Sequence, residues 1–110
     1  MTVNILTHPE FVRQMKRYAK KYRSIGNDFA VFLKSLHENP FQGVDLGGGI
    51  RKTRMAIAAK GKGKSGGMRV ITFSLEKMGD DIVNITLLYI YDKQEMENVS
   101  DDFIRYLLEK

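Results

Sequence analysis

Basic residues and glycines are concentrated between positions 51 and 69 of this chain. The stretch opens with RKTR, passes through a few apolar residues and alternates lysine with glycine in KGKGKSGG before it reaches Arg69. Glycines allow a ligand to approach the backbone closely, and ammonium and guanidinium groups bind phosphate. No Asp or Glu lies between Arg51 and Leu75. The pattern therefore predicts a phosphate-binding surface, for either a nucleotide or a polynucleotide.

Two nucleotide-binding motifs match part of this stretch, and both fail on their context. The run GKGKSG matches GxGxxG, and its GKS triplet matches the end of a P-loop. Each motif requires a helix directly after the loop, because the helix N-terminus receives the phosphate. Here MRVITFSL follows, and its branched and aromatic residues favour a strand. A P-loop would also have its first glycine at position 58, which is Ala58. The sequence therefore favours a basic surface on a sheet.

Composition indicates a single domain, spanning 1–110, with a polyanionic partner. The formal net charge is +5, which favours nucleic acid or an acidic protein over a neutral small molecule. The absence of cysteine excludes disulfides and thiolate metal sites. His8 and His37 have no metal-ligand partner at useful spacing, so neither a metal nor a small-molecule cofactor is expected. No signal peptide or apolar stretch of about 18 residues is present, so we expect no membrane contact and a soluble, cytoplasmic protein.

Two helices are expected before the basic stretch. Thr7 and Glu10 fit a capping box, with apolar residues at helical spacing behind them, and predict a helix over about 8–22. A second helix follows a short break and must end before Pro40. The outer face of the first helix is basic, and we interpret it as solvated: Arg13, Lys16, Arg17 and Lys20.

Strands are predicted at about 50–58, 68–76 and 82–91, with a possible short one at 3–6. Residues 41–49 are expected to form a glycine-rich loop. The turn at 77–81 contains Gly79 and Asp80, which permit an antiparallel hairpin. Ser100 is expected to cap a final helix, which would dock through four apolar residues: Phe103, Ile104, Leu107 and Leu108. The order of elements predicts an α+β sandwich.

Alternation along the first long strand separates its side chains onto two faces. Lys52 and Arg54 share one face, which we expect to be open, while Thr53, Met55 and Ile57 share the face covered by the helices. Arg69 begins the next strand and Lys93 follows the last one, so these four basic residues could converge: Lys52, Arg54, Arg69 and Lys93. The basic residues expected to surround these four and to bind the phosphates of a polyanion are Arg51, Lys60, Lys62 and Lys64.

Three segments together carry a family resemblance: LGGGIRKTRMAI, KGKGKSGGMRVITF and LLYIYDKQEMENVS. They resemble RelE-type toxins of bacterial type II toxin-antitoxin pairs, in the branch that includes HigB-like toxins. The resemblance extends from Phe11 to the final helix. It implies a RelE/ParE fold, with two N-terminal helices on a small, mainly antiparallel sheet of about four strands and a C-terminal helix.

The resemblance further implies an mRNA endonuclease that acts on the ribosome without a metal, through attack of the RNA 2′-hydroxyl on the adjacent phosphate. Lys52 and Arg54 resemble the paired basic residues of the family, Arg69 resembles its phosphate-stabilising arginine, and Lys93 lies near its basic residue after the last strand. A guanidinium stays protonated, so a lysine whose pKa is lowered by crowding would be the better base. Tyr91 is interpreted as a core or interface aromatic, and no tyrosine follows Lys93 as far as the final helix.

Two alternatives from other functional classes remain at this point. A ParE-like toxin would inhibit DNA gyrase without catalysis. A plain RNA-binding module would contact phosphates through the same patch, with an affinity that falls steeply with salt, but would cut no bond. For the toxin, the expected partners are mRNA, the ribosome and a cognate antitoxin with an acidic, partly disordered segment that could cover the basic face.

Overall fold

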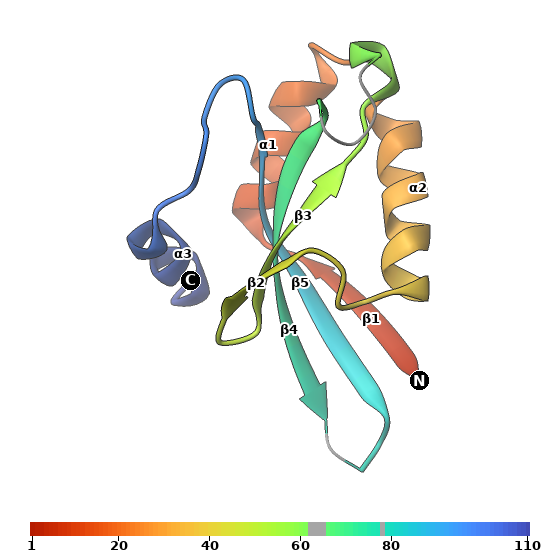
Figure 1. Ribbon diagram of the computed structural model, residues 1–110, viewed down its shortest axis with the longest axis vertical. Helices are drawn as coiled ribbons and strands as arrows, with labels where there is room; N and C mark the ends of the chain where they lie inside the picture. Colours follow the sequence, from red (N-terminus) through yellow and green to blue (C-terminus); the bar gives the residue numbers. More distant parts are fainter. Residues whose placement is uncertain (62–65, 78) are drawn as a thin grey trace.

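In the computed structural model, which describes residues 1–61, 66–77 and 79–110, five strands form one mixed sheet (Figure 1). The sheet order is β1-β5-β4-β3-β2. The bounds of the strands are β1 Thr2–Thr7, β2 Val44–Gly47, β3 Ile50–Met55, β4 Met68–Lys77 and β5 Ile82–Asp92. The helices are α1 Pro9–Ala19, α2 Ile25–Glu38, the 3-10 turn η1 Ala58–Lys60 and α3 Asp101–Leu108. The α+β class and the two helices followed by a meander are confirmed.

The sheet has one strand more than the sequence predicted. β1 pairs in parallel with β5, while the β2–β3, β3–β4 and β4–β5 pairs are antiparallel. β2 lies inside the stretch that was expected to be a loop, and its turn into β3 uses glycines in the left-handed region, with φ of +91° at Gly47 and +62° at Gly48. β3 ends at Met55 and not at about position 58, where the sequence placed its end, because the chain goes on into η1.

α1 and α2 cover one face of the sheet, as predicted from the alternation in β3. Met55 and Ile57 are buried in the core beneath these helices, together with apolar residues of β4 and β5. α2 ends before Pro40, as expected. Among the described helices, none is long and apolar enough to cross a membrane.

The start of α1 differs from the predicted capping box. The cap is His8 and not Thr7: its Nδ1 accepts a hydrogen bond from the Glu10 backbone N–H at 3.0 Å. Its Nε2 therefore carries the proton and donates to the Leu107 carbonyl in α3, also at 3.0 Å. The histidine thus joins two distant helices. α1 also ends at Ala19, earlier than the predicted position 22.

α3 covers part of the opposite face of the sheet, which the sequence analysis expected to be open. Ile104 and Leu107 pack into a second core made of residues from β3, β4 and β5: Ile50, Ile71, Leu88, Tyr89 and Tyr91. The expected cap is confirmed, since Ser100 Oγ accepts from the Phe103 N–H at 3.1 Å. Leu108 was expected to dock but is 41% exposed. A sheet with apolar residues on both faces needs a cover on both.

Candidate nucleic-acid interface

A row of three side chains crosses the face of the sheet on which α3 packs. Arg54 of β3 lies directly opposite Arg69 of β4, and Arg69 lies opposite Tyr91 of β5. Residues paired in this way have Cβ atoms about 5 Å apart. Two guanidinium-bearing residues are therefore neighbours at the ends of these strands. Since like charges directly opposite one another are unfavourable, an anion bound between them would be stabilising.

Lys52 lies two residues before Arg54 on the same face of β3, opposite Ile71 of β4. Its side chain is half-buried, and its Nζ donates a hydrogen bond to Asn98 Oδ1 at 3.0 Å. Asn98 belongs to the segment between β5 and α3, and exposed Lys93 lies at the start of that segment. The strand pairing thus brings Lys52 together with Arg54 and Arg69. We call these three residues the basic face.

The members of this row differ in burial. Arg54 is exposed, whereas Arg69 is 6% exposed and donates to the Met68 carbonyl at 3.4 Å. Tyr91 is 2% exposed, and its hydroxyl has no hydrogen-bond partner within the described part of the chain. Burial raises the pKa of Tyr91, and the charge of Arg69 partly offsets that rise. Burial in the second core fits the sequence interpretation of Tyr91, but only the structure reveals that its hydroxyl lacks a hydrogen-bond partner among the described residues.

Arg51 lies on the other face of the sheet from the basic face. Its guanidinium donates to Ser74 Oγ at 3.0 Å, lies 4.0 Å from the Asp45 carboxylate and sits 5.0 Å from the centre of the Phe41 ring. The segment 51–75 contains no acidic residue, but Asp45 of the neighbouring strand β2 lies opposite Arg51. Arg51 is therefore not grouped with the basic face. Two further predicted RNA-binding residues, Lys62 and Lys64, lie outside the described residues.

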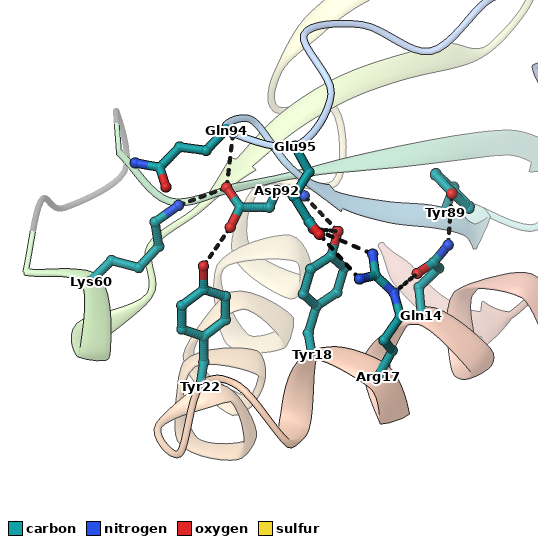
Figure 2. Close-up of polar contacts among 9 residues, drawn as sticks. All are labelled: Gln14, Arg17, Tyr18, Tyr22, Lys60, Tyr89, Asp92, Gln94 and Glu95. Atoms are coloured by element: carbon teal, nitrogen blue, oxygen red, sulfur yellow. Dashed lines mark hydrogen bonds and ion pairs between the residues drawn. The ribbon is translucent and has the colours of Figure 1, made fainter.

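Lys60 is directed into a polar cluster on the helix-covered side, rather than toward the basic face (Figure 2). Its side chain is 6% exposed, and its Nζ lies 2.8 Å from Oδ1 of Asp92, whose side chain is fully buried. Tyr22 donates to the other carboxylate oxygen, and the backbone N–H of Gln94 donates to Oδ1 at 2.9 Å. Burial raises the pKa of Asp92. The hydrogen bonds from Lys60 and Tyr22 lower it by more than burial raises it, so the pKa lies below its usual value.

A second carboxylate extends this cluster. Glu95 Oε2 accepts from the Tyr18 hydroxyl at 2.7 Å, and the Arg17 guanidinium donates to both oxygens of Glu95, at 3.1 and 3.4 Å. The hydrogen bond from Arg17 is the main reason why the pKa of Glu95 is lowered. Burial raises the pKa of Tyr18 to about 12. Arg17, predicted as part of a solvated face, is therefore ion-paired with a residue 78 positions away.

The fold and the basic face together define a small α+β protein that carries basic residues on two neighbouring strands. A comparison with protein-family models matches residues 11–109 to the RelE toxin of the RelE / RelB toxin-antitoxin system. This match covers most of the sequence, so the chain belongs to the RelE toxin family. It is accordingly a toxin of a toxin-antitoxin system, and the family implies a cognate antitoxin partner.

Proposed function

We propose that this protein is a ribosome-dependent mRNA endonuclease of the HigB-like branch, which acts in the cytoplasm and inhibits translation. The observation that carries the proposal is the direct opposition of Arg54 and Arg69 on neighbouring strands, with Lys52 beside them on the same face. A phosphodiester that lies on this face, above the β3–β4 pair, would be contacted by more than one cation. Membership of the RelE family supports RNA as the source of that phosphodiester.

The proposed reaction uses only the RNA and the side chains of the protein. The 2′-oxygen attacks the adjacent phosphorus, its proton passes to a base, and the bond from phosphorus to the 5′-oxygen breaks. The 5′-oxygen then takes up a proton. The products are a 2′,3′-cyclic phosphate and a 5′-hydroxyl, and no oxidant or reductant is needed.

The side chains of the basic face suit different parts of this reaction. Arg54 and Arg69 are assigned to the phosphate, because a guanidinium stays protonated and can stabilise the charge that develops on the phosphorane. Lys52 and Lys93 are assigned to the transfer of protons, since a lysine can exchange one.

The direct test is to incubate translating ribosomes with the purified protein and to map the ends of the mRNA. We expect new ends that carry a 2′,3′-cyclic phosphate on one fragment and a 5′-hydroxyl on the other. Arg69→Ala should weaken the cleavage, with circular dichroism as the check that the fold persists. An intact message would contradict the proposal, and full activity of the variant would contradict the assignment of Arg69.

The same preparation separates this function from its two alternatives. Salt-sensitive RNA binding without cleavage on ribosomes would favour a plain RNA-binding module. Arrest of DNA replication before translation, on expression in cells, would favour a gyrase inhibitor.

We further propose that the antitoxin presents an acidic segment to the basic face, because such a segment would neutralise the same charges that receive the RNA phosphate. Addition of the antitoxin should then block RNA binding.

A further inference from the structure

A polar cluster around the buried carboxylate of Asp92 joins three parts of the chain that are distant in sequence (Figure 2). We call it the Asp92 network. Its members are Tyr18 at the end of α1, Tyr22 just after that helix, Lys60 of η1, Asp92 at the end of β5 and Glu95 in the turn that follows. It lies on the helix-covered side of the sheet. None of its members belongs to the basic face.

Asp92 has hydrogen bonds on every one of its polar groups. Its carboxylate accepts from Lys60, Tyr22 and the Gln94 N–H. Its own backbone N–H donates to the Tyr18 hydroxyl at 3.0 Å. Its carbonyl accepts from the N–H groups of Glu95 and Met96, at 3.0 and 3.1 Å. The position and direction of the chain as it leaves β5 are therefore fixed at this residue.

The burial of a charged pair needs a reason other than stability. Removal of two charges from water costs about as much as their attraction returns, so well-packed apolar residues at such positions are often equally or more stable. A buried pair does, however, restrict geometry, because its hydrogen bonds are satisfied in only one arrangement. In this chain the restricted element is the turn from Asp92 to Met96.

That turn leads directly to the proposed RNA site. Lys93 is its second residue, and Asn98, two residues after Met96, accepts the hydrogen bond from Lys52 Nζ at 3.0 Å. The segment from 93 to 98 is thus anchored at one end by the Asp92 network and touches the basic face at the other. A displacement at Asp92 would move Lys93 and release Lys52.

We propose that Lys60 and Asp92 are positioning residues for RNA cleavage, which hold the turn after β5 so that Lys93 and Lys52 lie correctly at the basic face. The inference rests on the proposed function. Neither residue touches RNA: Lys60 acts through Asp92, and Asp92 acts through the turn.

The test is the double variant Lys60→Met with Asp92→Asn, which removes both charges together and leaves no buried charge unpaired. We expect a thermal midpoint close to that of the unmodified protein but cleavage on ribosomes reduced about 10- to 100-fold, in kcat more than in KM, because small misplacements of reacting groups cost that much. Lys60→Arg, which can still donate to Asp92, should retain most of the activity. Lys34→Met, at an exposed position on α2, is the matched control. A folded double variant with full cleavage would overturn the proposal.

Amide hydrogen exchange provides a second readout that does not depend on cleavage. The N–H groups of Glu95 and Met96 should exchange at least about tenfold faster in the double variant, because the turn that protects them loses its anchor. Should the double variant fail to fold, Tyr22→Phe, which removes one hydrogen bond to Asp92, should show the same change to a smaller degree. Unchanged exchange in the folded variant refutes the positioning role. If the unmodified protein leaves mRNA intact, the proposed function fails, and exchange alone then decides the role of the pair.

Discussion

The two sides of the sheet use their cations in opposite ways at the ends of β3, β4 and β5. On the helix-covered side, Lys60 is buried against Asp92, and Arg17 is paired with Glu95. On the side of α3, Arg54 of β3 lies directly opposite Arg69 of the neighbouring strand β4. The difference teaches that ion pairs hold the cations on one side, whereas like charges lie opposite one another on the other side, where we propose that phosphate binds.

The two arrangements have different energetic signatures. Removal of one member of a buried ion pair leaves the other charge uncompensated, so the folded state should lose stability. Removal of the exposed Arg54 guanidinium relieves its repulsion with Arg69, so the folded state should lose little stability while the affinity for an anion falls. Substitutions on the two sides therefore separate stability from activity.

The largest effect on stability is expected from Lys60→Met. This change strands the buried carboxylate of Asp92 and should lower the free energy of unfolding by about 3–5 kcal/mol. Urea denaturation measures it, with exposed Lys34→Met as the control that should stay within about 0.5 kcal/mol of the unmodified protein. Equal stability of the two variants would remove the distinction between the two sides.

Arg54→Gln should have the converse effect. We expect mRNA cleavage on ribosomes to fall about 100-fold, as for loss of one preorganised donor to a charged transition state. The free energy of unfolding should be unchanged or raised by up to about 1 kcal/mol, since the repulsion from Arg69 is relieved. The two measurements are made on one preparation, and a destabilised variant with full cleavage would reverse the assignment.

Tyr22→Phe tests a single hydrogen bond within the Asp92 network. The hydroxyl donates to a buried carboxylate, so its loss should cost about 1.5–3 kcal/mol in urea denaturation. Tyr106→Phe, at a residue that is 50% exposed, is the matched control and should be nearly neutral. A neutral Tyr22 variant would mean that Lys60 and the Gln94 N–H satisfy Asp92 without it.

Tyr91→Phe examines the opposite situation, a buried hydroxyl with no partner in the described residues. Its removal should leave the free energy of unfolding unchanged or slightly higher, because no hydrogen bond is lost. Cleavage on ribosomes should also be nearly unchanged, because the hydroxyl is buried in the second core and bound RNA cannot reach it. A loss of cleavage of about tenfold or more would contradict the assignment of Tyr91 to the core.

The last prediction concerns acid stability. The pKa values of Asp92 and Glu95 are both lowered in the folded protein, so the unfolded chain binds protons more readily than the folded one as the pH falls. The stabilisation from these carboxylates should therefore be complete above their unfolded pKa values near 4 and be lost as the pH falls from there through their lower folded pKa values. Between pH 5 and pH 2.5, the urea midpoint of Asp92→Asn should fall less steeply than that of the unmodified protein, because this variant lacks one of the two titrating carboxylates. Arg54→Gln keeps both carboxylates and should follow the unmodified protein.

Several features of the fold followed from the sequence because they depend on local rules. The end of α2 before Pro40, the hairpin at 77–81 and the cap at Ser100 each rest on residues within one turn of one another. The alternation of β3 likewise placed Lys52 and Arg54 on one face, because the period of a strand is fixed by its backbone.

The tertiary structure decided which charges are paired and what covers the sheet. Lys60 meets Asp92 across 32 positions, and Arg17 meets Glu95 across 78. His8 and not Thr7 caps α1, and its other ring nitrogen donates to the Leu107 carbonyl of α3. These partners are set by strand order and by the packing of α3, which no local pattern encodes. The sequence by itself determined that Lys52 and Arg54 share a face, because the alternation of a strand is local. Only the fold placed Arg69 opposite Arg54 and paired Lys60 and Arg17 with carboxylates, because strand pairing and packing join residues that are distant in sequence.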